Sequence, residues 1–159
     1  NYNAEVVVGA MGNVAEASQI LIAFDCCCLS GTAIVLLHPS ETVKIFQGQP
    51  NCKIIPAGTV IFERGKPGDY MYGIIEGEVT QALDGKVVET LKAGDVFGEG
   101  ALVHPEGVRF TTAVAKTNCK LACLDRSHFL FAIQETPMFA LEVMRSYSDR
   151  LQLLKQRLV

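Results

Sequence analysis

The stretch VFGEGALVHPEGVRFTT, residues 96–112, decides how the rest of the chain is interpreted. It opens with a carboxylate between two glycines, Gly98-Glu99-Gly100, and it ends with Arg109 before an apolar, β-branched run. Glycine lets a backbone approach a ligand closely because it has no Cβ. An acceptor carboxylate, the free N–H groups of a short helix and a guanidinium fork together suit a sugar phosphate. The alternative is a strand, a tight turn and a second strand, with both charged side chains in solvent.

The composition is that of one domain of ordinary size. The chain has 159 residues, with 14 basic and 17 acidic side chains and a formal charge of -3. A chain of this length can bury enough core to fold unaided. The negative balance argues against nucleic acid as the main partner, because phosphate backbones require a basic surface.

The cysteines and histidines predict neither a disulfide framework nor a metal site. Three of the six cysteines are consecutive, and no zinc-like spacing occurs. We therefore expect free thiols and a cytoplasmic protein. No metal-ligand or nucleophile-and-base spacing is present either, so we expect no cofactor and no enzyme activity. The histidines belong to three separate segments: His38, His104 and His128.

Residues 1–40 differ from the remainder of the chain. No basic residue precedes Lys44, and residues 20–37 are nearly all apolar apart from Asp25 and a Ser-Gly-Thr step. Three interpretations stay open: an element packed on the domain or on a partner, a leader sequence, and a membrane anchor. We rank the anchor last, because Asp25 would cost about 2.5–3.5 kcal/mol in a membrane-spanning helix. We place the boundary before residue 41, so that residues 41–159 form the main domain.

A β pattern extends over residues 52–125. Short apolar runs alternate with turns, and Asp84-Gly85 between two such runs is a strong hairpin signal. Evenly spaced short strands predict a mainly β fold, an antiparallel β jelly-roll barrel with flanking helices. A short helix capped by Ser40 is expected at residues 42–46. The expected strands are residues 53–55, 59–62, 71–75, 78–83, 87–91, 110–115 and 119–124.

Beyond residue 125 the pattern becomes helical, with helices expected over about residues 127–158. We expect Ser127 to cap a helix at residues 128–134 and Pro137 to begin a long C-terminal helix. Leu141, Val143 and Leu153 would pack on the barrel, so we predict a homodimer through a second apolar face. The alternative is that this stripe packs on its own barrel. The stripe has steps of four and three residues: Ala140, Met144, Tyr147, Leu151, Leu154 and Leu158.

The segment GDYMYGIIEG at residues 68–77, together with Phe97-Gly98-Glu99, Ala101-Leu102 and Arg109, resembles the cyclic-nucleotide-binding domain family. The resemblance covers about residues 41–159. It is closest to the sensory half of the bacterial catabolite activator type, in which the corresponding glutamate and arginine are also ten residues apart. A helix-turn-helix would need tens of residues after Val159, so we expect no DNA binding by this chain.

This resemblance implies roles for individual residues. Glu99 would accept a hydrogen bond from a ribose 2′-hydroxyl, and Arg109 would pair with a cyclic phosphate. The N–H groups of Gly100 and Ala101 would add to the anion site, and Gly98 would let the chain turn against the sugar. The implied ligand is a cyclic nucleotide or a related small phosphate, with cAMP favoured. The C-terminal helix would cover the base and shift when the ligand binds.

Three positions depart from the family pattern. Phe110 follows the arginine where a small residue is usual, and Gly100 replaces a usual leucine or isoleucine. Leu154 and Lys155 stand where the catabolite activator has hydroxyls, and of these Leu154 can pack on a base. We predict a stand-alone ligand-sensing regulatory domain. The alternative is a degenerate domain that no longer binds nucleotide and acts as a dimeric interaction module.

Overall fold

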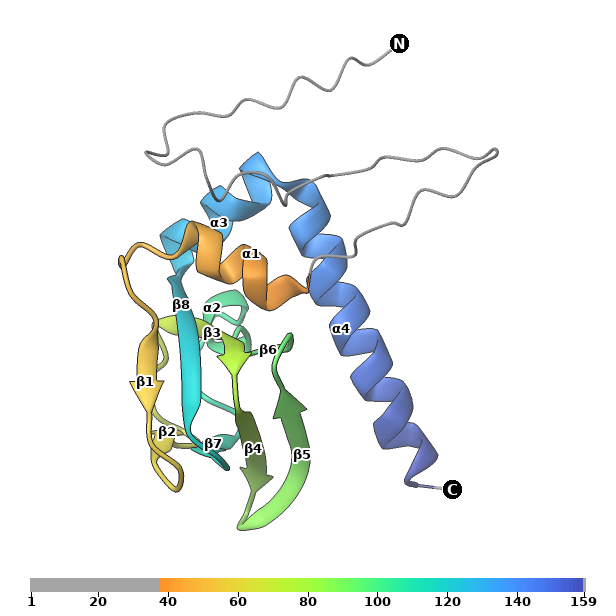
Figure 1. Ribbon diagram of the computed structural model, residues 1–159. Helices are drawn as coiled ribbons and strands as arrows, with labels where there is room; N and C mark the ends of the chain where they lie inside the picture. The colour runs from red at the N-terminus through yellow and green to blue at the C-terminus, as the bar shows by residue number, and fades with distance from the viewer. Residues whose placement is uncertain (1–37, 159) are drawn as a thin grey trace, which may run out of the picture. The chain divides into compact units, whose positions relative to one another are not determined.

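The computed structural model describes residues 38–158, which belong to one compact unit (Figure 1). The predictions made for residues 1–37 lie outside the described residues. The helices are α1 (Pro39–Phe46), α2 (Gly100–Val103), α3 (Arg126–Glu135) and α4 (Pro137–Gln156). The strands are β1 (Lys53–Ile55), β2 (Val60–Phe62), β3 (Tyr70–Glu76), β4 (Glu78–Leu83), β5 (Lys86–Lys92), β6 (Val96–Phe97), β7 (Thr112–Ala115) and β8 (Cys119–Asp125).

These strands form two antiparallel sheets, which confirms the predicted jelly-roll barrel. One sheet has the order β1-β8-β3-β6 and the other β2-β7-β4-β5. The predicted hairpin joins β4 to β5, and both turn residues, Asp84 and Gly85, have positive φ. Such a turn matches the twist of the strands that it connects. The two-residue strand β6 was not predicted, because Val96-Phe97 is too short to show a period.

The sheet that contains β3 and β8 is covered on both faces. One core lies between the two sheets and includes Ile74, Phe97 and Leu121. The other lies between this sheet and the helices and includes Met71 and Phe139. Burial on both faces explains why β3 and β8 are almost continuously apolar. Figure 1 shows α1 and α3 at one end of the barrel and α4 extending along the side of β5.

Two helix starts differ from the prediction. α1 begins at Pro39, whose fixed φ suits the first helical position, and Ser40 is buried inside the helix instead of capping it. α3 begins at Arg126, and its N-cap is Asp125, not Ser127. The Asp125 carboxylate accepts a hydrogen bond from the His128 N–H at 2.9 Å and another from the Ser127 hydroxyl at 2.7 Å. Ser127 therefore supports the capping residue.

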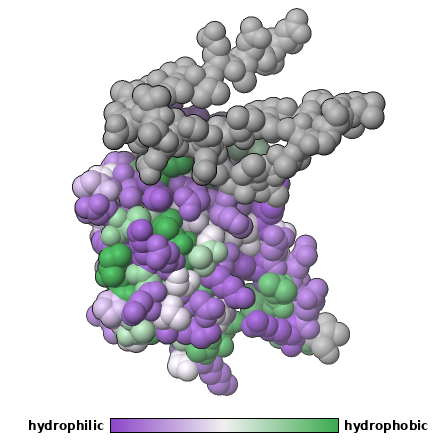
Figure 2. All heavy atoms as spheres, viewed as in Figure 1, coloured by the Kyte–Doolittle hydropathy of each residue, from purple (hydrophilic) through white to green (hydrophobic). Residues whose placement is uncertain are grey.

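Helix α4 begins at Pro137 as predicted, but a different face contacts the barrel. Phe139 and Val143 are buried, whereas Leu141 and Leu153 are about half exposed. Of the three residues predicted to pack on the barrel, only Val143 does so. Hydrophobic side chains remain visible on the surface near the C-terminal part of α4, among mostly hydrophilic residues (Figure 2). Within residues 38–158, every helix is too short or too polar to cross a membrane.

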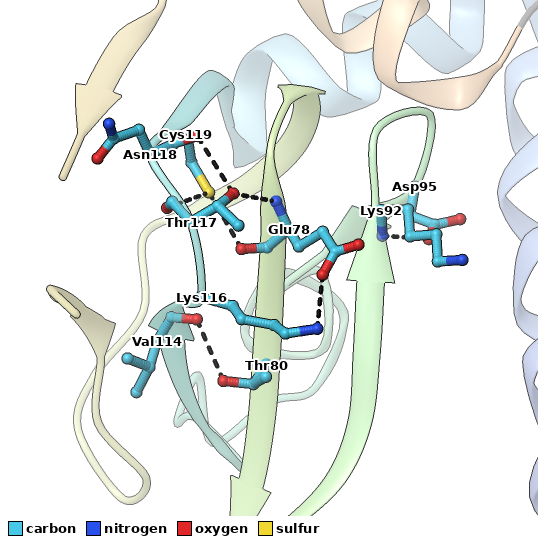
Figure 3. A network of polar contacts seen from close by, with 9 residues as sticks. All are labelled: Glu78, Thr80, Lys92, Asp95, Val114, Lys116, Thr117, Asn118 and Cys119. Carbon is cyan, nitrogen blue, oxygen red and sulfur yellow. Dashed lines mark hydrogen bonds and ion pairs between the residues drawn. The ribbon is translucent and has the colours of Figure 1, made fainter. Parts of the chain in front are cut away.

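The start of β4 is fixed by the turn that joins β7 to β8 (Figure 3). The Lys116 N–H donates to the Glu78 carbonyl at 2.8 Å, and the Glu78 N–H donates to the Thr117 hydroxyl at 2.9 Å. The Lys116 ammonium also contacts the Glu78 carboxylate at 2.7 Å. These contacts fix the register of β4 beside β7, and Gln81 in the middle of β4 lines a pocket.

Candidate functional site

A pocket lies between the second sheet, residues 98–101 and α4. Its volume is about 420 Å³, including the part that is open to solvent. Pockets for small organic ligands commonly have volumes of about 300–1,000 Å³. The lining residues come from five separate segments: Phe62, Gln81, Gly98, Glu99, Gly100, Ala101, Arg109, Phe110, Thr111, Tyr147 and Arg150.

Arg109 is buried in this pocket, with only 5% of its surface exposed. One terminal nitrogen donates to the Gly98 carbonyl at 2.6 Å and the other donates to the Tyr70 carbonyl at 2.7 Å. The guanidinium also lies over the Phe62 ring, 4.2 Å from its centroid. These contacts hold the side chain in place, but they use only two of its five N–H donors.

The remaining donors of Arg109 leave it free to pair with an anion. Its Nε is buried and has no hydrogen-bond partner among the described residues, and no carboxylate forms an ion pair with the guanidinium there. Burial lowers the pKa of Arg109, and the neighbouring Tyr72, Asp69 and Glu99 oppose that shift. Arginine nevertheless stays protonated in proteins. A buried cation without a paired anion is costly, and a bound phosphate would offset that cost.

Glu99 supplies an unused acceptor in the same pocket. Its Oε2 atom is buried and has no hydrogen-bond partner within residues 38–158. The phenol of Tyr147, on α4, lies beside this carboxylate. Burial and the charge of Glu99 raise the pKa of Tyr147 well above its ordinary value, and Arg150 partly opposes the effect. Tyr147 therefore stays a neutral hydroxyl beside the Glu99 side chain.

Gly98 is required by the geometry around Arg109. Its φ is +79°, a conformation that side chains disfavour. A Cβ at this position would lie 2.7 Å from a terminal nitrogen of Arg109. Because Gly98 has no side chain, its backbone carbonyl can approach Arg109 closely enough to accept the hydrogen bond from the guanidinium.

The N–H groups at the start of α2 are available to a ligand. Leu102 and Val103 donate to the Glu99 carbonyl, whereas the N–H groups of Gly100 and Ala101 have no intrachain acceptor within the described part of the chain. The first N–H groups of any helix lack partners inside that helix. Both groups belong to residues that line the pocket, so an anion there can accept from them.

Two of the departures from the family pattern lie next to each other. The Phe110 ring is 56% exposed at the pocket and packs edge-on against His104, with centroids 5.2 Å apart. A Cβ on Gly100 would lie 3.7 Å from this ring, which is an ordinary contact. A methyl group at position 100 would therefore fit beside the Phe110 ring. Phe110 lies at the pocket wall without filling the interior.

Six of the seven predicted site residues line this one pocket, from Gly98 to Ala101 together with Arg109 and Phe110. Leu154 does not line it, and its contact with a base stays a prediction. In its place, α4 contributes Tyr147, about two turns earlier, and Arg150, about one turn earlier. Sequence reasoning assigned Tyr147 to the dimer stripe and gave Arg150 no role in the site.

Gln81 and Thr111 were also missed, although the sequence contains a signal for one of them. Side chains two residues apart in a strand point to the same face. Val79 is fully buried, so Gln81 occupies a position that faces inward on β4. A polar residue at an inward position calls for a functional explanation.

Arg150 connects α4 to the barrel wall beside the pocket. Its Nε and one terminal nitrogen contact the two oxygens of Glu89 on β5 at 2.5 and 2.6 Å, and the other terminal nitrogen donates to the Val96 carbonyl at 3.0 Å. Burial lowers the pKa of Arg150, but the hydrogen bonds and charge of Glu89, together with Tyr147, raise it by more, so the net shift is upward.

Comparisons with known proteins relate this chain to one family of domains. A family model described as the cyclic nucleotide-binding domain matches residues 52–136. A cAMP-dependent protein kinase regulatory subunit from Schizosaccharomyces pombe is 44% identical over 77 residues, which are 48% of this chain and 18% of that protein. A cyclic nucleotide-gated potassium channel from Rhizobium etli is 37% identical over 98 residues, or 62% of this chain and 27% of the channel.

Among solved structures, the Catabolite Activator Protein of Thermus thermophilus is similar with a TM-score of 0.60 and 26% identity. The match covers 76% of this chain and 57% of that one. The chain spans less than a third of the length of the two sequence relatives, so the similarity concerns one domain of each of them.

Proposed function

The chain belongs to the cyclic nucleotide-binding domain family, and from this premise we propose that its pocket binds a cyclic nucleotide, with cAMP favoured. Arg109 and the N–H groups of Gly100 and Ala101 would bind the cyclic phosphate. Glu99 would accept a hydrogen bond from the ribose 2′-hydroxyl. The relative that is 44% identical over 77 residues is named a cAMP-dependent protein kinase regulatory subunit. This name supports cAMP as the first ligand to test.

One observation carries this proposal: the pocket contains a buried donor and a buried acceptor that are both unsatisfied. Arg109 Nε and Glu99 Oε2 have no partners among the described residues, and both residues line the pocket. Leaving a buried polar atom unpaired costs about 1–3 kcal/mol. A ligand with an anion and a hydroxyl group a few ångströms apart would satisfy both atoms, and a cyclic nucleotide has this pair of groups.

We further propose that α4 transmits the state of the pocket. Tyr147 and Arg150 place this helix in direct contact with the site, so a ligand that contacts them changes the free energy of the docked helix. Met144 and Leu151 are more than half exposed on α4 and are seven residues apart. This spacing favours pairing with the same helix of a second chain, and the readout would then be the arrangement of a homodimer.

Isothermal titration calorimetry with cAMP, 2′-deoxy-cAMP and cGMP tests the pocket assignment. We expect wild-type protein to bind cAMP, and Arg109→Ala to weaken binding by at least about 100-fold, because a charge-assisted bidentate contact is lost. Glu99→Ala should weaken cAMP binding but leave the affinity for 2′-deoxy-cAMP nearly unchanged. Arg64→Ala is the matched control, because Arg64 is an exposed arginine that pairs with Asp84 on the surface.

Three results would overturn the assignment. If wild-type protein binds neither cAMP nor cGMP at high micromolar concentration, the pocket is not a cyclic nucleotide site and the interaction module is the better description. If Arg109→Ala binds as well as Arg64→Ala, the phosphate lies elsewhere. If Glu99→Ala weakens the binding of cAMP and of 2′-deoxy-cAMP equally, Glu99 does not contact the 2′-hydroxyl. Circular dichroism of each variant checks that it is folded.

A further inference from the structure

Gln81 is a buried polar residue in the pocket that the phosphate and ribose contacts do not use. Within residues 38–158 only four polar or charged residues are buried: Ser40, Thr42, Gln81 and Arg109. Ser40 and Thr42 belong to α1, away from the pocket lining, whereas Gln81 and Arg109 both line it. Gln81 is 9% exposed and lies in the middle of β4.

The carboxamide of Gln81 is held in a defined orientation. The Thr111 hydroxyl donates to Gln81 Oε1 at 2.9 Å, and Thr111 also lines the pocket. In the sheet, Gln81 pairs with Ala113 on β7 and with Glu89 on β5. Glu89 is itself fixed by Arg150. The Gln81 Nε2 group has no intrachain acceptor within the described residues, so its N–H donors are available to a ligand.

We propose that Gln81, oriented by Thr111, recognises the base of the bound nucleotide and selects adenine over guanine. This inference rests on the proposed function. If Arg109 binds the phosphate and Glu99 binds the ribose, the base lies against the other polar residues that line the pocket. A carboxamide presents one donor and one acceptor side by side. Adenine offers the complement at N7 and the N6 amino group, the pairing that glutamine makes with adenine in nucleic acids.

Guanine does not offer the same complement at this edge. It carries two acceptors there, N7 and O6, so Gln81 Oε1 would face O6 without a proton between the two oxygens. Rotating the carboxamide would exchange its two ends, but it would still present one oxygen, and it would break the hydrogen bond from Thr111. The pocket therefore favours cAMP through an attractive contact and opposes cGMP through a repulsive one.

The test compares cAMP, 7-deaza-cAMP and cGMP in competition binding to the full chain. The analogue 7-deaza-cAMP lacks only the N7 acceptor, so it isolates the hydrogen bond from Gln81 Nε2. We expect wild-type protein to bind cAMP about tenfold more tightly than 7-deaza-cAMP, as one good base contact allows, and to prefer cAMP to cGMP. Gln81→Leu keeps the side-chain volume and should bind cAMP and 7-deaza-cAMP within about threefold of each other.

A second pair of variants separates orientation from folding. Thr111→Val should reduce the preference for cAMP over 7-deaza-cAMP at least about threefold, because Gln81 loses its orienting donor. Thr80→Val is the matched control, since the Thr80 hydroxyl donates to the Val114 carbonyl and Thr80 does not line the pocket. Thr80→Val should keep the wild-type preference for cAMP over 7-deaza-cAMP.

The inference is overturned if wild-type protein binds cAMP and 7-deaza-cAMP equally, or if Gln81→Leu and Thr111→Val keep the wild-type preference. In either case cyclic nucleotide binding itself stands, and another group reads the base. If wild-type protein binds none of the three ligands, the proposed function fails and this inference fails with it.

Discussion

Arg150 on α4 and Glu89 on β5 form a bidentate ion pair that joins the C-terminal helix to the wall of the pocket. The two contacts are 2.5 and 2.6 Å long, and the side chains are only 13% and 16% exposed. Arg150 also lines the pocket. The same side chain therefore both attaches α4 to the barrel and lines the pocket.

Breaking this pair should release α4 without unfolding the barrel. Removing one partner leaves the other charge buried and unpaired, and it also removes the polar attachment beside Tyr147. We expect Glu89→Gln to raise amide hydrogen exchange in residues 144–156 by about tenfold or more, while exchange in β3 and β8 stays slow. Mass spectrometry of peptides from the intact protein measures both regions in one experiment.

A double-mutant cycle gives the strength of the contact and an internal control. The cycle consists of Glu89→Ala, Arg150→Ala and the double variant. Their free energies of unfolding in urea should give a coupling energy of about 1–3 kcal/mol. The pair between Glu78 and Lys116 is much more exposed, and its coupling should be smaller. A coupling at Glu89 and Arg150 no larger than that of the exposed pair would mean that the ion pair does not hold the helix.

The two glycines that flank Glu99 should respond differently to alanine. Gly98→Ala forces a side chain into a positive φ and against the Arg109 guanidinium, so we expect lower stability and loss of ligand binding. Gly100→Ala meets only an ordinary contact with Phe110 and should be neutral or stabilising by up to about 1 kcal/mol. Thermal unfolding and calorimetry of both variants test this contrast, and equal effects would contradict it.

The N-cap of α3 predicts a pH dependence of stability. Hydrogen bonds from the His128 N–H, the Ser127 hydroxyl and the His128 side chain lower the pKa of Asp125 to about 2. Because its pKa is lowered by folding, ionised Asp125 stabilises the protein above about pH 4, and this contribution is lost as the pH falls from 4 toward 2. We expect Asp125→Ala to lower the free energy of unfolding by about 1 kcal/mol at pH 7.

Asparagine at the same position is the control, because it also caps helices but does not titrate. The difference in unfolding free energy between wild type and Asp125→Asn should shrink as the pH falls from about 4 to 2. Urea unfolding at pH 7 and pH 3 measures it. A difference that does not change with pH would show that the charge of Asp125 contributes nothing to the cap.

Each turn and each strand of the barrel has a sequence signal of its own. Most of the barrel could therefore be predicted from the sequence. The positive φ of Asp84 and Gly85 follows from the residue types. The resemblance to the cyclic-nucleotide-binding family, which includes the ten-residue spacing from Glu99 to Arg109, implied that both residues line one pocket. Capping was harder to predict, since Asp125 and Ser127 are both good N-cap residues and only the geometry of the chain end chooses between them.

The side of the pocket formed by α4 was not predictable in the same way. Which face of a helix meets the barrel depends on how the helix crosses it, and a spacing of three and four residues specifies a stripe but not its partner. Tyr147 belongs to the predicted dimer stripe and also lines the pocket. Arg150 received no role in the sequence analysis, because its partner Glu89 is 61 residues away in the sequence.

The predicted dimer can be tested with two leucines on the same helix. Leu151 and Leu153 are both more than half exposed, but they point about 200° apart around the helix axis, since each residue turns about 100°. Leu151 shares the stripe of Ala140 and Met144, and Leu153 lies on the opposite face. We expect Leu151→Glu to shift the protein to monomer in sedimentation velocity, because two buried carboxylates would face each other across the interface. Leu153→Glu should have the same oligomeric state as the wild-type protein. Equal behaviour of the two variants would show that the exposed stripe on α4 is not the interface.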